Sequence, residues 1–461
     1  MDVELVRRRK SLEERQRERQ RERLIFFTVL LWVALFLAGW AALPRALRAL
    51  PPRYVARLPE PIQALVREPA DSRVPTPAIP VASQADLLRL MTSLPVATPP
   101  PTVTPRPTPG GHIGGGPSPD MKPPAPDTAT PQPPPPPTAT PTEAPSGFRL
   151  TGFRLVYQTW NNCGPATLTV NLNYYGWTGT QADAAAVLKP DREDKNVSPD
   201  EMAAFARSVL GLQALVRVNG ALDRLKALLR AGIPVIVESG YDPDPETLGW
   251  MGHYLLAIGY DDAQGHFIVH DVYQGGGDKG DGVPDPYENF DRFWRHFNRT
   301  YIIVYRPDQA QTVADILGAD RDDTAMYTGA LARAQAEAAA NPKDAFAWFN
   351  IGSSLVGLGR YEEAAAAYDQ ARILGLPWRM LWYQFGPFEA YYRVGRYDDV
   401  LALAQANLRV TPYVEETFYY KGLVYQAQGD LNAARENFQL ALRYNPNFYR
   451  ASAALAALPP G

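Results

Sequence analysis

The stretch QTWNNCGPATLTVNLNYYGW, residues 158–177, decides the fold of the largest part of the chain. Asparagine often precedes the first residue of a helix, as Asn161 and Asn162 would here, and glycine often ends one, as Gly176 would. We therefore expect a helix from Cys163 to Tyr175, with the only cysteine of the chain in its first turn. Backbone N–H groups and the helix dipole stabilise an anion there and favour the nucleophilic thiolate. An isolated cysteine is more often a small buried residue, so its neighbours must decide between the two roles.

Composition limits the classes of protein that the chain can belong to. Of its 461 residues 45 are proline, and 20 of these lie between Pro95 and Pro145, which no packed domain tolerates. Roughly 310 residues remain, enough for two ordinary domains. One cysteine excludes an intrachain disulfide scaffold and any multi-cysteine zinc or iron–sulfur site. The net charge is −3, so the chain lacks the excess of basic residues that is typical of nucleic-acid-binding proteins, and no nucleic-acid partner is expected.

Residues 24–43, LIFFTVLLWVALFLAGWAAL, are twenty positions without a charge. At 1.5 Å per residue they span a hydrocarbon core of ~30 Å, which predicts a single transmembrane helix. Residues 1–23 carry nine Lys or Arg against six Asp or Glu, which favours a cytoplasmic N-terminus, a single-pass protein of the cell membrane and extracytoplasmic domains. Arginines after the span weaken this orientation. The alternative is a cleavable signal peptide with a weak small-residue site near Gly39–Ala41, although its apolar region would be unusually long.

Residues 44–147 show no sustained periodicity and include TPPPTVTPRPTP and PQPPPPPTATPTEAP. Such a sequence cannot bury enough apolar surface to offset its ordering entropy, so a disordered Pro-rich linker is expected. Proline-rich segments extend by ~3.1 Å per residue, so the linker is expected to be a semi-rigid stalk that separates the folded domains from the membrane segment. The alternative role is a ligand for proline-recognising domains.

A nucleophilic thiolate needs a base, and the chain holds five histidines. We disfavour His112, which lies in the linker, and His296, which lies in the helix-like segment FDRFWRHF. The other three belong to two strand-like segments, GHYLLAIGYDD (252–262) and GHFIVHDVY (265–273). A short turn joins these segments, which predicts a β-hairpin.

The expected hairpin brings His253 close to Asp271. If Tyr260 faces His266, the numbers of paired residues sum to 526, and Asp271 lies on the same face as His253, two positions along. His270 then points to the other face. A slip of one residue would exchange Asp271 for His270. A carboxylate beside an imidazole fixes its tautomer and stabilises the imidazolium, so the cysteine and these two residues are candidates for a catalytic triad.

Gln158 completes the candidate site. An amide side chain just before a nucleophile-bearing helix can donate a hydrogen bond to a developing oxyanion, alongside the backbone N–H of Cys163. Taken alone, a glutamine is more often a solvated side chain. Its combination with the cysteine and the histidine favours the functional role.

These motifs resemble a known family. Residues 158–177, followed about ninety residues later by GHYLLAIGYD and then IVHDV, are similar to papain-like cysteine peptidases. Within these the nearest branch is the one related to bacteriocin double-glycine leader peptidases, the peptidase C39-like domain. The resemblance covers residues 148–307 and implies an α+β papain-like domain that hydrolyses amide bonds.

The resemblance also implies the roles of the candidate residues: Gln158 as the oxyanion glutamine, Cys163 as nucleophile, His253 as general base and Asp271 as the orienting acid. The aspartate is the least specific match, because HDV replaces the more familiar aspartate–proline pair. No transporter is present, so leader processing coupled to export is not carried over. Neither a cofactor nor a metal is implied.

Residues 308–461 contain internal repeats. LGRYEEAAAAYDQA, VGRYDDVLALAQAN and QGDLNAARENFQLA place their glycines at Gly359, Gly395 and Gly429, spaced 36 and 34 residues apart. A period near 34, with an aromatic-bearing helix before each glycine, is typical of tetratricopeptide repeats. We expect an all-α solenoid whose concave groove binds a protein or peptide. The array could instead only stabilise its neighbouring domain.

The second repeat departs from the pattern. Val400 and Asn407 occupy positions that alanine usually holds, and two residues are inserted. Before the first repeat, GALARAQAEAAANP is expected to form a partial repeat, and FYRASAALAAL after the third a capping helix.

The expected function is that of a membrane-anchored extracytoplasmic cysteine peptidase, with the repeats recruiting a peptide or protein substrate or a partner. The alternative is a non-catalytic surface scaffold, in which the repeats bind and the papain-like groove is inactive. Acids and glycines in residues 278–285 suggest a calcium loop, but the spacing that such loops need is missing, so a solvated active-site loop is favoured. Residues 240–252 would form a substrate-side lid or a surface loop.

Overall fold

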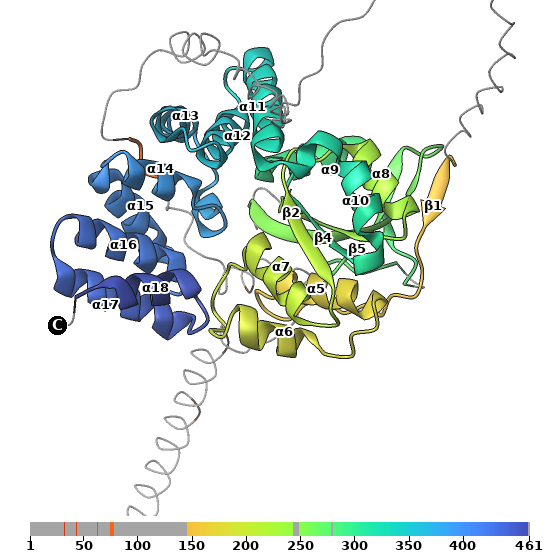
Figure 1. The fold of residues 1–461 in the computed structure, drawn as a ribbon, viewed down its shortest axis with the longest axis horizontal. Helices are drawn as coiled ribbons and strands as arrows, with labels where there is room; N and C mark the ends of the chain where they lie inside the picture. Colours follow the sequence, from red (N-terminus) through yellow and green to blue (C-terminus); the bar gives the residue numbers. More distant parts are fainter. Residues whose placement is uncertain are drawn as a thin grey trace, which may run out of the picture.

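The computed structural model describes residues 32, 43, 62, 74–77, 145–242, 249–277 and 280–459 (Figure 1). Among these residues no helix combines the length and the apolar character needed to cross a membrane. Apart from Trp32 and Leu43, the expected transmembrane segment 24–43 lies outside the described residues. The basic segment 1–23 and most of the linker lie outside them as well.

The first domain is built on one seven-stranded sheet in the order β2-β7-β3-β4-β5-β6, with β1 paired to β4. All of its pairings are antiparallel. The strands are β1 (Gly147–Arg149), β2 (Gln213–Arg217), β3 (Val235–Tyr241), β4 (Met251–Asp261), β5 (His266–Asp271), β6 (Val283–Pro286) and β7 (Tyr301–Tyr305).

Helices cover both faces of this sheet, because its central strands are apolar on both sides. In β4, Tyr254, Leu256 and Ile258 pack into the cluster with α5, α6 and α7, whereas Leu255 and Ala257 pack against α8, α9 and α10. This alternation follows from the period of two in a strand. The helices are α5 (Cys163–Tyr174), α6 (Gln181–Leu188), α7 (Pro199–Ser208), α8 (Leu222–Arg230), α9 (Tyr287–Trp294), η1 (Arg295–Phe297), η2 (Pro307–Gln309), α10 (Ala310–Leu317) and η3 (Gly318–Arg321).

Helix α5 runs through the middle of the domain. Its residues from Gly164 to Leu172 are buried without a break, so even its polar side chains need partners inside the protein. Thr167 donates to the carbonyl of Tyr254 at 3.1 Å, and Asn171 donates to that of Pro234 at 3.3 Å. These bonds fix the helix to β4 and to the start of β3. The helix expected from Cys163 is confirmed to within one residue.

The second domain is a curved array of helix pairs beside the sheet domain (Figure 1). As expected, a helix precedes the first repeat and a capping helix follows the third. Each repeat glycine has a positive φ between its two helices, as a tight turn requires. The helices are α11 (Asp323–Ala340), α12 (Ala345–Gly357), α13 (Tyr361–Leu374), η4 (Trp378–Trp382), α14 (Gly386–Arg393), α15 (Tyr397–Val410), α16 (Glu415–Ala427), α17 (Leu431–Tyr444) and α18 (Tyr449–Ala457).

Trp250 joins the two domains. Its ring stacks on Phe297 at 5.8 Å and contacts Phe346 and Tyr383 of the repeats, and its Nε1 donates to Nδ1 of His296 at 3.0 Å. Its exposed fraction is only 8%, so this end of residues 240–252 is part of the domain interface. The lid expected over that segment is not formed by Trp250, because the repeats cover it; residues 243–248 lie outside the described residues.

A cluster of buried carboxyl groups lies at a second contact between the domains. Glu415 and Glu416 at the start of α16 are buried near Asp194 and Glu201, and Asn196 donates to Glu416 at 2.8 Å. Burial and the neighbouring acids raise the pKa of both α16 glutamates well above the ordinary value. Burial also raises the pKa of Asp194, to about 7. Clustered carboxyl groups stabilise the contact only while they are protonated, because their negative charges would repel one another.

We predict that Glu416→Gln stabilises the protein in mildly alkaline solution. A raised pKa in the folded state gives stability that is present at acidic pH and lost as the pH rises through that pKa. The glutamine stays neutral, so the melting temperature of the variant should exceed that of the wild type by about 2 °C at pH 8. The difference should shrink towards pH 5.

The exposed Glu436 on α17 provides the control, because Glu436→Gln should leave the melting temperature unchanged at both pH values. Equal melting curves for Glu416→Gln and the wild type at pH 8 would show that the cluster does not ionise there.

Candidate active site

The turn before α5 positions Cys163 at the first residue of the helix. Asn161 has φ +52°, a left-handed conformation that asparagine tolerates better than most residues. The buried Lys189 donates from Nζ to the carbonyl of Asn161 at 2.8 Å and to that of Asp194 at 2.8 Å. Lys189 therefore fixes the turn to the loop between α6 and α7, a role that sequence reasoning missed.

Asn162 is the N-cap residue of α5, but its side chain does not cap the helix. Its Nδ2 instead donates to Oε1 of Gln181 at 2.7 Å. The first N–H groups of α5 are therefore not satisfied by this side chain. They belong to Cys163 and Gly164, because Pro165 has none, and such groups favour a negative charge nearby.

The hairpin of β4 and β5 brings His253 and Asp271 together. Nε2 of His253 lies 2.8 Å from Oδ1 of Asp271, and both side chains are buried. The same oxygen accepts the backbone N–H groups of Tyr273, at 2.7 Å, and Gln274, at 3.1 Å. The carboxylate is thus fixed in the position from which it orients the imidazole.

The register of this hairpin agrees with the expectation only near the candidate site. Leu255 pairs with Asp271, as the sum of 526 requires, but a bulge between Ala257 and Gly259 shifts the remaining pairs by one. The expected pairing of Tyr260 with His266 is therefore wrong: Tyr260 pairs with Phe267. The extra residue of a bulge cannot be read from alternation alone.

His253 is held in its charged form. Burial opposes the charge, but the carboxylate of Asp271 and an interaction with the thiol of Cys163 outweigh it and raise the pKa of His253 to about 10. Because Nε2 faces Asp271, Nδ1 is the ring nitrogen left to exchange a proton with Cys163. The arrangement favours an imidazolium at the side of the pocket that contains Cys163.

Gln158 is buried beside the same loop. Its backbone N–H donates at 2.8 Å to the carbonyl of Val272, the residue after Asp271. Its side-chain Oε1 is buried without a hydrogen-bond partner among the described residues. Gln158 does not line the pocket that contains Cys163, so the structure places it next to the candidate site but does not show its amide in the pocket.

The remaining described histidines are not part of the site. His270 points to the opposite face of the hairpin, as expected, and burial lowers its pKa to about 4. His296 stacks on Phe346 at 3.6 Å in the domain interface, and burial lowers its pKa to about 3. His112 lies outside the described residues.

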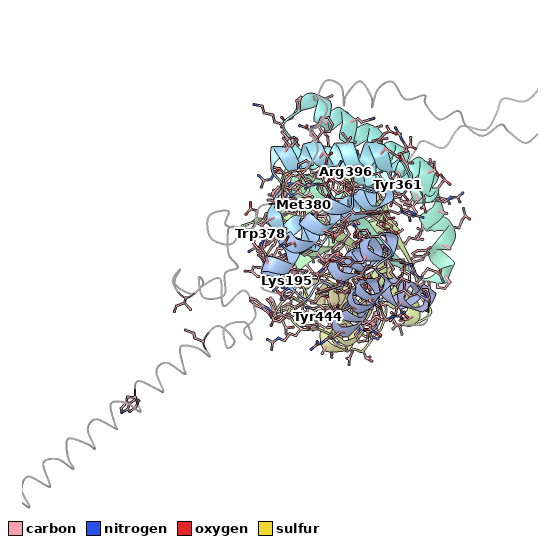
Figure 2. All side chains as sticks on the ribbon, turned by 90° about the vertical axis from the view of Figure 1, so that its left-hand side faces the viewer. Lys195, Tyr361, Trp378, Met380, Arg396 and Tyr444 are labelled. Carbon is pink, nitrogen blue, oxygen red and sulfur yellow. The ribbon has the colours of Figure 1, made fainter. Side chains whose placement is uncertain are left out.

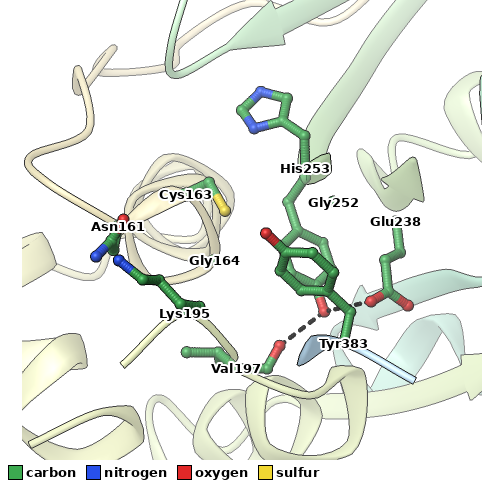
Figure 3. A pocket seen from close by; sticks show the side chains of 10 residues that line it. Asn161, Cys163, Gly164, Lys195, Val197, Glu238, Gly252, His253 and Tyr383 are labelled. Carbon is green, nitrogen blue, oxygen red and sulfur yellow. Dashed lines mark hydrogen bonds between the residues drawn. The ribbon is translucent and has the colours of Figure 1, made fainter. Parts of the chain in front are cut away.

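The pocket between Cys163 and His253 also contains a buried acid, Glu238 of β3 (Figure 3). The hydroxyl of Tyr254 lies 2.8 Å from the carbonyl of Val197 and 3.3 Å from Oε1 of Glu238. The hydroxyl has one hydrogen and the carbonyl can only accept, so a protonated Glu238 satisfies both contacts. Burial accordingly raises the pKa of Glu238 well above the ordinary value. The sequence holds no motif that would have identified this residue.

One wall of this pocket comes from the repeats. Tyr383, just after η4, lines the pocket together with Cys163 and His253 (Figure 3). Its ring packs on Gly252 so closely that a Cβ atom there would lie 2.9 Å from it. The pocket has a volume of only about 10 Å³, room for one water molecule. Sequence reasoning missed Tyr383, because its domain was expected only to recruit ligands.

The unusual second repeat is what carries Tyr383 into the site. Instead of a full first helix, this repeat forms the short turn η4, and α14 begins only at Gly386. Asn407, which replaces the usual alanine, is buried and donates at 2.7 Å to the carbonyl of Leu381 in that turn. Arg379 donates to the carbonyl of Trp250 at 3.2 Å.

The turn η4 also approaches the loop between α6 and α7. Nζ of Lys195 lies 5.9 Å from the ring centre of Trp382 and 5.5 Å from that of Trp160. In Figure 2, Met380 and Trp378 lie between Arg396 of the repeats and Lys195 of the first domain. The turn η4 therefore contacts Lys195 of this loop as well as Trp250.

A larger cavity of about 330 Å³ lies on the other side of His253. Ser239, Gly240 and Asp271 line it near the histidine. Farther away its lining is mixed, with Tyr241, Asp285, Arg292 and Phe293 among the contributing side chains. This volume suits an amino-acid side chain or a short peptide segment.

No group of three or more potential metal ligands occurs among the residues that the structure describes. Of the possible calcium loop at 278–285, Asp278 and Lys279 lie outside these residues. Asp281 lies 3.7 Å from Arg149, and Asp285 accepts a hydrogen bond from Asn289.

Comparison with known families agrees with this architecture. Residues 150–302 match the model of the Peptidase_C39 like family, and residues 347–371 and 415–448 match models of the tetratricopeptide repeat. The resemblance expected from the motifs is thus confirmed for both domains. The first domain is a mixed α/β domain of the C39-like type, and a helical repeat region follows it.

Three solved structures are similar to parts of the chain. A putative C39-like peptidase from Bacillus anthracis is 18% identical and covers 35% of this chain and 98% of its own, with a TM-score of 0.29. The peptidase domain of Streptococcus ComA, a bifunctional ABC transporter, is 19% identical and covers 34% and 99%, with a TM-score of 0.26. MamA is 16% identical and covers 30% and 80%, with a TM-score of 0.25. No curated protein matches the chain.

We predict that Cys163 reacts rapidly with iodoacetamide at pH 7 and that His253→Ala slows the reaction about tenfold. A free thiol is only a few per cent thiolate at that pH, whereas a thiol paired with an imidazolium is largely ionised. The rate for the wild type should stay level between pH 7 and pH 9. The rate for the variant should rise across this range.

Because Cys163 is the only cysteine, the label reports on it alone. His266→Ala, which removes a half-buried histidine at the far end of the hairpin, is the matched control and should leave the rate unchanged. A wild-type rate that rises between pH 7 and pH 9 as the variant does would show that no ion pair forms.

Proposed function

We propose that the protein is a cysteine peptidase that hydrolyses amide bonds in a peptide or protein substrate. One observation carries the proposal: Cys163 at the start of α5 shares a pocket with His253, whose other ring nitrogen is 2.8 Å from buried Asp271. The match of residues 150–302 to a peptidase-like family supports it. These three residues act as nucleophile, general base and orienting acid.

In the proposed reaction the thiolate of Cys163 attacks the amide carbonyl carbon, and the carbonyl electrons move to its oxygen. The amide of Gln158 and the backbone N–H of Cys163 stabilise that oxyanion. The imidazolium of His253 gives its proton to the nitrogen as the C–N bond breaks and the amine leaves. Water then transfers a proton to His253 and attacks the thioester, which releases the acid and the thiolate.

The repeats take part in substrate selection through Tyr383. The pocket beside the nucleophile is small because this ring closes it, so a bulky side chain cannot enter without displacing η4. Substrate groups that follow the scissile bond on the His253 side can use the larger cavity. The groove of the repeats recruits a protein substrate or a partner.

For location we propose the arrangement that the sequence favours. Residues 24–43 anchor the chain in the cell membrane, the basic N-terminus is cytoplasmic and both folded domains are extracytoplasmic. A peptidase on a long proline-rich linker reaches substrates at a distance from the membrane surface.

A second candidate function is a non-catalytic scaffold, and the closed pocket is the observation that favours it. A volume near 10 Å³ holds no peptide, and Gln158 does not line it. In that case the repeats bind a partner and the papain-like domain is an inactive support.

The test of the peptidase proposal is a library of quenched fluorescent peptides with the full chain. The wild type should cleave a subset, Cys163→Ala should abolish cleavage, and Gln158→Ala should lower kcat by about 10²–10³ with little change in KM. A lost oxyanion donor acts mainly on the transition state, which explains that split. Gln264→Ala, at an exposed position in the turn between β4 and β5, is the control and should change kcat less than about threefold.

Cleavage that survives Cys163→Ala would assign the activity to a contaminant. Absence of cleavage across the library, together with a slow thiol in the alkylation test, would favour the scaffold.

We further predict that Tyr383→Ala broadens the specificity of cleavage. Removing the ring opens the pocket, so peptides with bulky residues next to the scissile bond should gain at least fivefold in kcat/KM relative to small ones. Asn407→Ala, which releases η4 without contacting the pocket, should act in the same direction with a smaller change.

The exposed Tyr449 on α18 supplies the control, since Tyr449→Ala should leave the ratio unchanged. If Tyr383→Ala lowers activity on all peptides equally, the ring supports the fold and does not select the substrate.

A further inference from the structure

Four residues of the linker lie against the repeats. Val74, Pro75, Thr76 and Pro77 are described by the structure, whereas the residues on either side of them are not. Figure 1 shows this short orange segment next to α14. These residues belong to the linker expected over residues 44–147.

Val74 is buried by this contact. Its exposed fraction is 7%, and it belongs to the apolar cluster that runs through the first two repeats. Pro75 and Pro77 are half-buried, whereas Thr76 between them is exposed. One side of the segment therefore faces the protein and the other faces solvent.

A buried arginine of the repeats binds the backbone of the segment. Nε of Arg372 on α13 donates at 2.8 Å to the carbonyl of Pro75. The Arg372 side chain is only 1% exposed, and its Nη1 donates at 2.8 Å to Oδ1 of Asp399. Its Nη2 is buried without a hydrogen-bond partner among the described residues.

The surrounding charges hold Arg372 in a fixed position. Asp399 also accepts from Arg396, which in turn binds Asp369 at 2.6 Å, and the hydroxyl of Tyr391 donates to Asp369 at 2.8 Å. The guanidinium of Arg372 lies 5.1 Å from the ring centre of Tyr391. Two arginines and two aspartates balance one another, so the group that meets the linker is a preformed donor and not a flexible surface charge.

The chemistry of the segment fits such a donor. Pro75 and Pro77 have no N–H, and each proline restricts the residue before it to extended conformations. The segment therefore offers carbonyl acceptors from a backbone that is already extended and loses little entropy on binding. The repeats recognise two features of the segment: the apolar side chain before the first proline, and the carbonyl of that proline, which accepts from Arg372.

We propose that this surface of the repeats is a binding site for an extended proline-containing segment and that Val74–Pro77 of the same chain occupies it. A contact of four residues is weak between separate molecules. Within one chain the linker supplies the segment at an effective concentration in the millimolar range, which maintains the contact.

The first experiment measures the position of the segment by pulsed electron spin resonance on the full chain. Spin labels are attached at the exposed positions Thr76→Cys and Gln405→Cys in a Cys163→Ser background. We expect a narrow distance distribution that becomes several-fold broader when Val74→Asp is added. A distribution that is broad in both chains would overturn the proposal.

The second experiment adds a fluorescent peptide of residues 71–80 to the full chain. It should bind the Val74→Asp chain, whose site is empty, at least tenfold more tightly than the wild type, and the same peptide with Val74→Asp should bind neither. Changing Val74 leaves the Arg372 network untouched, so folding of the repeats is not at risk. Equal binding to both chains would overturn the proposal, and a mass that doubles with concentration would show that a second copy supplies the segment.

Discussion

The buried hydrogen bond between His253 and Asp271 is the interaction on which the rest of the site depends. Neither group is tolerated in the interior without the other, because an unpaired buried charge costs several kcal/mol. His253 and Asp271 meet only in one register of β4 and β5, at the end of the hairpin away from its turn. The bulge after Ala257 separates this register from the one that the strands have near the turn. The imidazole then faces α5, where the fixed turn before Cys163 presents the thiol.

Much of this could be read from the sequence, because the deciding features are local. The helix after Asn162 and the hairpin rest on spacings of a few residues, and the repeats rest on a period near 34. The roles of the four candidate residues came from the resemblance of their motifs to a family. The pairing of Tyr260 was wrong because one extra residue in a bulge leaves no pattern. Glu238 and Tyr383 were missed because each reaches the pocket by a contact between elements that are distant in sequence.

The turn η4 and Asn407, which replaces the usual alanine, act together in the second repeat. Asn407 introduces a buried donor, and the carbonyl of Leu381 in η4 accepts from it. A regular repeat would have continued its first helix and kept Tyr383 away from Gly252. The irregularity therefore connects the solenoid to the peptidase-like domain. An array that only supported its neighbour would not need a side chain beside the nucleophile.

In the proposed membrane-anchored arrangement, the contact of Val74–Pro77 shortens the free part of the linker. A free linker over residues 44–147 could extend by ~320 Å, since its 104 residues span ~3.1 Å each. With the segment bound to α13, only residues 44–73 remain between the proposed anchor and the repeats, and these 30 residues reach ~90 Å at most. The docked segment thus sets the reach from the proposed anchor to about a third of the full length.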